Sequence, residues 1–169
     1  GAEVVLARLA ARAGAGGIVG VNVGANRDSA DRTDDYVRLI ETFAPVASYF
    51  TLNVSSPNTP QLRDLQKRDA LDELLARVVD TRDRVSRSAG ATPVLLKIAP
   101  DVTLPELDDI VGAARKRRID GMIVGNTTTA RPPDLRERVK SIEQGGLSGR
   151  PLFRLSTRVL AETYVRVED

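Results

Sequence analysis

The chain has 169 residues, of which 41% are hydrophobic and 28% are charged, and 25 Lys and Arg against 23 Asp and Glu give a formal net charge of +2. This composition indicates one globular domain or a piece of a larger one, and it excludes a disordered or fibrous protein. The absence of Cys and His excludes disulfides, thiolate nucleophiles, Ser–His–Asp triads and most zinc sites. We therefore expect no metal and, from the balanced charge, no nucleic-acid partner.

Predicted helices and strands alternate along the chain. In chain order they are a helix at 1–12, a strand at 17–23, a helix at 36–43, a strand at 49–54, a helix at 71–85, a strand at 94–98, a helix at 107–114, a strand at 121–126 and a helix from 151 onward. The strands are apolar almost without interruption, which predicts burial on both faces. Thr103 and Glu106 form a predicted capping box with Pro105 in the first turn.

This alternation predicts parallel strands joined by helical crossovers. Two architectures fit the pattern, a doubly wound sheet and a (β/α)8 barrel. Four strand–helix units amount to half of a barrel, which needs about 250 residues. The chain begins with Gly1 and ends with Asp169 without a closing element, so we expect it to be an excerpt from a longer protein.

Polar side chains lie near the carboxyl ends of all four predicted strands, where parallel α/β folds bind their ligands. They are Asn22, Asn53, Lys97 and Asn126. Asn22 or Asn126 alone is equally compatible with a turn. Lys97 is more informative, because an ammonium flanked by Leu and Ile is costly to bury unpaired. The set suits a flat ligand rich in heteroatoms.

The loops after these strands are polar. Residues 53–60 (Asn-Val-Ser-Ser-Pro-Asn-Thr-Pro) offer amides and hydroxyls on a proline-stiffened segment, and 126–129 repeat that theme. Residues 144–150 form a glycine-rich connection whose N–H groups either face a ligand or simply turn the chain. No dinucleotide fingerprint or Walker A motif is present. The basic run at 115–118 indicates a solvated helix end.

Segments 21–26, 53–60, 96–101, 126–129 and 145–152 together resemble the quinone-dependent (class 2) dihydroorotate dehydrogenases, in order and over essentially the whole chain. The resemblance implies a partial (β/α)8 TIM barrel, strands three to six of the family barrel, as a single FMN-binding domain over 1–169. It implies oxidation of dihydroorotate to orotate in pyrimidine biosynthesis, with hydride passing to FMN and electrons on to a quinone. Class 1 relatives are expected to use Cys as the base, so Ser56 in a chain without Cys favours class 2.

The resemblance also implies roles for individual residues. Ser56 would be the catalytic base, with Thr59 assisting in proton relay. The implied substrate contacts are Asn53, Asn58, Asn126 and Thr127, and the implied FMN contacts are Asn22, Asn53, Lys97, Gly125 and Gly149. Departures from the family pattern occur at Ala25, Gln61 and Gly125, and at Gly125 any side-chain contact with FMN is lost.

The family's N-terminal quinone-tunnel helices and last two barrel strands have no counterpart in the sequence. We expect the parent protein to associate peripherally with the cytoplasmic face of the cell membrane through such a missing segment, and the 169 residues alone to be inactive. Two other hypotheses remain open: an acyl-transfer enzyme with Ser56 as nucleophile and Lys97 as base, and a half-barrel that binds a ligand without catalysis.

Overall fold

The computed structural model describes residues 1–86, 92–136 and 142–168. Four parallel strands form one sheet in the order of the chain: β1 (Gly20–Val23), β2 (Tyr49–Asn53), β3 (Val94–Ile98) and β4 (Gly121–Val124). The helices are α1 (Ala2–Ala11), α2 (Arg32–Phe43), α3 (Arg68–Val85), α4 (Leu104–Lys116) and α6 (Phe153–Glu168), with short 3-10 helices η1 (Leu62–Gln66) and η3 (Arg150–Leu152). The predicted strand–helix alternation is confirmed.

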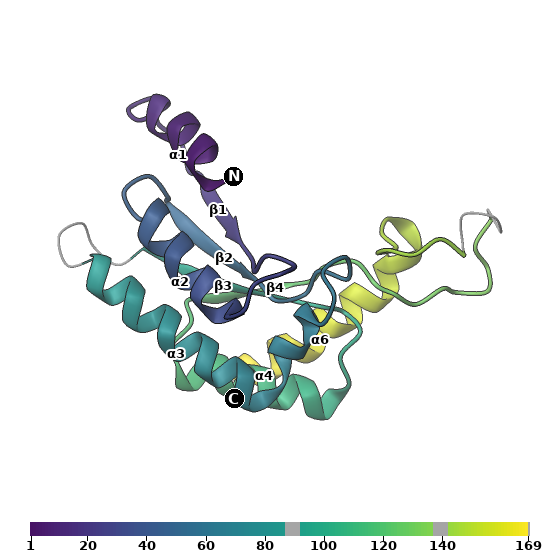
Figure 1. The fold of residues 1–169 in the computed structure, drawn as a ribbon. Coiled ribbons are helices and arrows are strands. Elements are labelled where there is room, and N and C mark those ends of the chain that lie inside the picture. The colour runs from purple at the N-terminus through teal and green to yellow at the C-terminus, as the bar shows by residue number, and fades with distance from the viewer. Residues whose placement is uncertain (87–91, 137–141, 169) are drawn as a thin grey trace.

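The helices that follow the strands all lie along one side of the sheet. Figure 1 shows α2, α3, α4 and α6 in a row beneath the strands, while no helix covers the opposite face among the described residues. A doubly wound sheet carries helices on both faces, and its strand order reverses at a switch point. Sequential strand order with helices on one face only is instead the arrangement of consecutive units in a (β/α)8 barrel.

The prediction that every strand is buried on both faces is wrong. Only β2 has three consecutive buried residues, whereas β1 and β3 alternate and β4 is half-buried throughout. Residues pointing to the helices, such as Val23 and Leu96, are buried, and those on the other face, such as Asn22 and Lys97, are not. The reason is that no described element packs on that second face.

Several boundaries differ from the predictions. The first strand begins at Gly20 rather than at 17, since Gly17 has a φ of +83°, outside the extended region. The second strand ends at Asn53 and the fourth at Val124, so Val54 and residues 125–126 belong to loops. The last helix begins with η3 and continues as α6, and η1 has no counterpart among the predicted elements.

Helix starts follow the sequence signals closely. The capping box is present: the Glu106 N–H donates to Thr103 Oγ1 at 3.4 Å, and the Thr103 N–H donates to Glu106 Oε2 at 2.7 Å. Asp31 caps α2 by accepting the Asp34 N–H at 3.0 Å. Both N-terminal caps satisfy backbone N–H groups that a helix leaves unpaired in its first turn.

Arg115, Lys116 and Arg118 are exposed, as predicted for a solvated helix end, but the run also contacts α3. The half-buried Arg117 donates to Asp72 of α3 at 2.8 and 2.7 Å, and Lys116 donates to the same carboxylate at 3.1 Å. Hydrogen bonds from Arg117 and then Lys116 hold the pKa of Asp72 well below its usual range. The run therefore joins α4 to α3. Among the described residues, no helix is both long and apolar enough to cross a lipid bilayer.

The core lies between the sheet and the helices, and α3 contributes its largest share of fully buried leucines. We expect Leu74→Ala to lower the free energy of unfolding by about 2–5 kcal/mol, because Leu74 is fully buried and its removal leaves a cavity. Leu104, 44% exposed at the start of α4, is the matched control, and Leu104→Ala should cost less than about 1 kcal/mol. Denaturant titration measures both, and equal losses would contradict this account of the core.

Candidate active site

The strand register brings polar side chains together on the open face of the sheet. Asn53 of β2 pairs with Lys97 of β3, two residues along the strands from the pair of Thr51 with Leu95. Both pairs therefore project their side chains to the same face of the sheet. Asn22 of β1 pairs with Thr51 and therefore lies on the same face, two strands away from Lys97. Three of the four predicted strand-end residues thus share one face, near the carboxyl ends of their strands.

A hydrogen-bond network joins the ends of β2 and β4. Asn53 Oδ1 accepts from Ser55 N at 3.2 Å, from Ser55 Oγ at 2.9 Å and from Asn126 Nδ2 at 3.3 Å. Asn126 Nδ2 also donates to Ser55 Oγ at 3.0 Å, while its Oδ1 accepts the Thr127 N–H at 2.8 Å. These bonds fix the orientation of both amides, because each oxygen is used as an acceptor. Among the described residues the Asn53 NH2 group donates to no protein acceptor, so this group, on the strand next to that of Lys97, is available to a ligand.

The two adjacent serines of the loop have different surroundings. Ser55 is fully buried and its hydroxyl proton is directed to Asn53. Ser56 is half-buried, and its Oγ accepts the Asn58 N–H at 3.3 Å. Among the described residues, the Ser56 hydroxyl donates to no protein acceptor, and no hydrogen bond joins it to Thr59. Ser56 is therefore the serine whose hydroxyl is available to a ligand.

The backbone of β2 is held from the helix side as well. The buried Tyr36 hydroxyl of α2 donates to the Asn53 carbonyl at 2.8 Å. Burial raises the pKa of Tyr36, so the phenol stays protonated and remains a donor. Asn53 is thus fixed at its carbonyl by α2 and at its side chain by Ser55 and Asn126.

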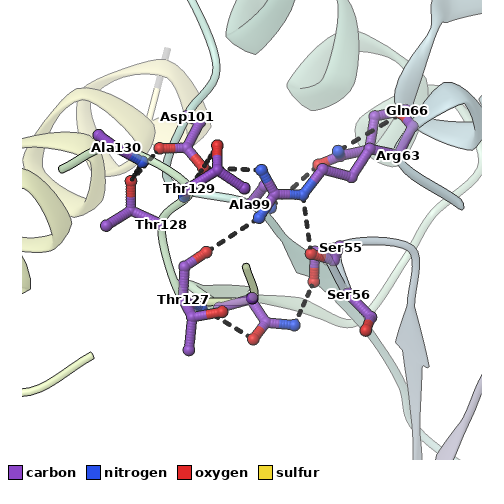
Figure 2. Close-up of polar contacts among 12 residues, drawn as sticks. Ser55, Ser56, Arg63, Gln66, Ala99, Asp101, Thr127, Thr128, Thr129 and Ala130 are labelled. Carbon is purple, nitrogen blue, oxygen red and sulfur yellow. Dashed lines mark hydrogen bonds and ion pairs between the residues drawn. The ribbon is translucent and has the colours of Figure 1, made fainter. Parts of the chain in front are cut away.

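Arg63 of η1 is a site residue that the sequence reasoning missed. Its Nε donates to the Ser55 carbonyl at 3.1 Å, one terminal nitrogen donates to the Thr127 carbonyl at 2.9 Å, and the other contacts Asp101 Oδ2 at 2.7 Å. Figure 2 shows the guanidinium between these three groups, with the Ser56 side chain pointing away from it. The available signal was an Arg just after the Pro-rich loop and an Asp just after residues 97–100, but neither is distinctive in sequence.

Asp101 anchors Arg63 to the loop after β4. It accepts from the Thr128 hydroxyl and from the Thr129 N–H at 3.0 Å, as well as from Arg63. Burial acts to raise the pKa of Asp101, but hydrogen bonds from Thr128, Thr129 and Arg63 outweigh it, so the pKa is lowered. The carboxylate is therefore charged at neutral pH and keeps its partners.

The glycine-rich connection packs directly on the loop after β4. Leu147 and Thr128 exchange backbone hydrogen bonds at 2.8 and 3.0 Å. A Cβ at Gly146 would lie 1.9 Å from Thr127 Oγ1, so only glycine permits this approach. Gly149, with φ of +77°, is exposed and is not brought into contact with the Asn53–Asn126 network. Gly125 lies against β3, where a Cβ would be 2.9 Å from the Ile98 carbonyl.

Lys97 is half-buried on the open face. Across the described ranges its ammonium makes no hydrogen bond or ion pair, with Ser56 or any other residue, so the Ser–Lys pair that acyl transfer requires is not formed. The same ranges contain no group of three acidic or other side chains placed to hold a metal ion. An unpaired ammonium beside a free amide NH2 is instead a donor set suited to an electron-rich ligand.

Comparison with known families gives one match over the whole chain. The family model for dihydroorotate dehydrogenase matches residues 1–169. A protein named dihydroorotate dehydrogenase (quinone) from Rhodopseudomonas palustris (strain HaA2) is 75% identical over 168 residues, and one of the same name from Bradyrhizobium sp. (strain ORS 278) is 73% identical. Each alignment covers 99% of this chain but 46% of the relative, so the chain spans about half the length of these relatives.

Solved structures support the fold. The dihydroorotate dehydrogenase of Eimeria tenella in complex with ferulenol superimposes with a TM-score of 0.91 at 34% identity, over 99% of this chain and 50% of that one. The ligand-free form from the same organism gives a TM-score of 0.89 and the same identity, over 52% of its chain. The prediction of a partial barrel is confirmed by these matches.

Proposed function

This chain belongs to the dihydroorotate dehydrogenase family, and we propose that it is the central portion of a quinone-dependent enzyme that oxidises dihydroorotate to orotate in pyrimidine biosynthesis. The observation that carries the proposal is the joining of the Ser56 loop, Asn126 and Lys97 at one end of the sheet, in a chain that is 75% identical to a dihydroorotate dehydrogenase (quinone). The proposal covers the whole protein, of which these residues are one part.

The cofactor of the proposed enzyme is FMN, which when bound would supply the hydride acceptor. The residues present fit such a group, since Lys97 and the Asn53 NH2, which have no hydrogen-bond partner among the described residues, offer donors on the open face to the carbonyl oxygens and ring nitrogens of a flavin. Asn22 extends this polar row, and Gly125 and Gly149 are proposed to approach the cofactor through their backbones.

Ser56 is the proposed catalytic base. It would take the proton from carbon 5 of dihydroorotate while hydride leaves carbon 6, which forms the double bond of orotate. A serine hydroxyl is a weak base in water, so the step needs a closed, dry site and an acceptor for the hydroxyl proton. Ser56 is supported over Ser55 because the Ser55 hydroxyl is already committed to Asn53. Thr59 is the proposed relay for the Ser56 proton.

Amide and hydroxyl side chains around Ser56 are the proposed substrate contacts. Dihydroorotate carries a carboxylate and a ring with both N–H donors and carbonyl acceptors, which amides can match in both senses. The proposed contacts are Asn53, Asn58, Asn126 and Thr127. Asn53 and Asn126 are already oriented by their mutual hydrogen bonds, so part of the ordering cost of binding is met before substrate arrives.

Electrons are proposed to leave the flavin for a membrane quinone. The quinone tunnel and the contact with the cytoplasmic face of the membrane are assigned to N-terminal helices outside the 169 residues, and the FMN phosphate to the last two barrel strands. The test is orotate formation by the purified full-length protein with a soluble quinone as acceptor. Turnover with quinone supports the proposal, and absence of dihydroorotate oxidation with every acceptor would overturn it.

We expect the 169 residues alone to show no dihydroorotate oxidation. The sheet ends at β1 and β4, which leaves two unpaired edges that tend to pair with other molecules, and half of the proposed flavin site is missing. The measurement is the same assay on the isolated chain, with the full-length protein as a parallel positive control. Turnover by the isolated chain would contradict the proposal that half of the flavin site lies outside these 169 residues.

A further inference from the structure

We propose that Arg63 is a positioning residue that sets the place of the catalytic serine through the backbone of the residue before it. The inference rests on the proposed function, because it assigns to Arg63 the alignment of Ser56 with substrate. Among the described residues no hydrogen bond joins Arg63 to the Ser56 hydroxyl, and Figure 2 shows the Ser56 side chain pointing away from the guanidinium.

The peptide geometry gives the first argument. The carbonyl of Ser55 belongs to the same rigid planar unit as the N–H of Ser56, so fixing that carbonyl fixes the direction in which Ser56 leaves the loop. Arg63 Nε holds this carbonyl at 3.1 Å, while the Ser55 N–H and hydroxyl are held by Asn53. Without Arg63, the Ser55 carbonyl loses the one hydrogen-bond donor that it has among the described residues, and the Ser56 side chain gains freedom to rotate away from its position.

The guanidinium also links the segments that follow three separate strands. Through Ser55 it holds the loop after β2, through Asp101 the segment after β3, and through Thr127 the loop after β4. Gln66 adds a further link, since its Oε1 accepts the Ala99 N–H at 3.0 Å and its Nε2 donates to the Arg63 carbonyl at 3.5 Å. The proposed base and the proposed substrate contact Thr127 are therefore set relative to each other by one side chain.

Burial and charge make this linkage rigid. The side chains of Arg63 and Asp101 are only 24% and 22% exposed, and Asp101 is held in turn by Thr128 and Thr129. Three donors in a planar fork are used at once, an arrangement that the single ammonium of a lysine cannot reproduce. Arg63→Lys therefore tests the hydrogen-bond geometry alone, because it keeps the positive charge but cannot make all three hydrogen bonds at once.

The experiment compares Arg63→Lys and Arg63→Ala with wild type in the full-length protein. A displacement of the base by about 1 Å lowers the rate of flavin reduction by roughly 10- to 100-fold, while the dissociation constant of orotate changes by less than about 3-fold. Stopped-flow absorbance gives the rate and equilibrium titration gives the constant. The matched control is Arg32→Ala, which should leave both values unchanged, since the half-buried Arg32 donates to the Pro60 carbonyl at the end of the same loop, at 2.9 Å.

Two further readouts separate positioning from simple structural support. A cleft of about 410 Å³ is lined by Arg63, Gln66 and Asp101, so added guanidinium should enter it, restore the rate of Arg63→Ala and leave the rate of Arg32→Ala unchanged. Hydrogen exchange of the substrate-free protein should become faster over 54–59 and 127–129 in Arg63→Lys, with the rest of the chain unchanged.

The outcomes distinguish failure of the proposed function from failure of the role proposed for Arg63. Failure of wild type to reduce its flavin with dihydroorotate would overturn the proposed function, whatever the variants do. Normal wild-type reduction with Arg63→Lys within about 3-fold of it, and unchanged hydrogen exchange over the two loops, would overturn the role of Arg63 alone. Equal losses of reduction rate and orotate affinity, without guanidinium rescue, would also overturn it, since that pattern indicates a structural role.

Discussion

Ser56→Ala lowers the rate constant of flavin reduction by dihydroorotate by roughly 10²- to 10⁴-fold in the full-length protein, the range expected when a general base is removed. Orotate affinity stays within a few-fold of wild type, because the contacts proposed for the ligand come mainly from asparagine amides. The amides of Asn53 and Asn126 keep their orientation in this variant, since their hydrogen bonds run through Ser55 and not through Ser56. Stopped-flow reduction and orotate titration on the same preparation measure both effects.

Ser156→Ala provides the control for this comparison. Ser156 lies in α6, and its hydroxyl donates only to the Phe153 carbonyl of the preceding turn. Removing it should leave the reduction rate unchanged. A loss of orotate binding as large as the loss of rate in Ser56→Ala would show that Ser56 supports the loop and does not act as the base.

Lys97→Ala should weaken flavin binding by roughly 10- to 100-fold, the value of one hydrogen bond from a charged donor of about 1.5–3 kcal/mol. Reduction adds negative charge to a flavin ring, and an adjacent ammonium stabilises that charge, so the variant should also have a more negative reduction potential. The half-buried Lys97 has no protein partner among the described residues, so its truncation breaks no ion pair there.

Flavin retention on gel filtration and a dye-coupled reductive titration measure these two quantities. Lys116→Ala serves as the control, since Lys116 lies on α4 and contacts Asp72 on the helix side of the sheet. If flavin affinity and potential in Lys97→Ala both match wild type, the proposed contact between Lys97 and the flavin is wrong.

Local signals predicted much of the fold. The apolar runs identify all four strands, and the capping box at Thr103 and Glu106 is present as expected because it depends only on residues three apart. Burial on both faces was wrong for β1, β3 and β4, because among the described residues no element packs on the open face of the sheet. The start at Gly20 in place of 17 reflects the left-handed conformation of Gly17, which apolarity does not reveal.

Several residues of the candidate site were predicted from the sequence, but the hydrogen bonds that join them were not. Asn53, Lys97 and Asn126 were identifiable as polar groups at strand ends, and the sheet register and hydrogen bonds bring them together. Ser55 and Ser56 are adjacent and chemically identical, so only burial and partners distinguish them. Arg63 was missed because its partners Ser55, Asp101 and Thr127 are 8, 38 and 64 residues away, and such contacts appear only when strand ends meet. The catalytic and binding roles remain predictions.

The most direct test is the visible spectrum of the full-length protein, recorded before and after anaerobic addition of dihydroorotate. We expect a flavin absorbance band that bleaches on addition, because hydride transferred from the substrate reduces the bound cofactor. A colourless protein that cannot be reconstituted with FMN, or a flavin band that dihydroorotate leaves unchanged, would contradict it.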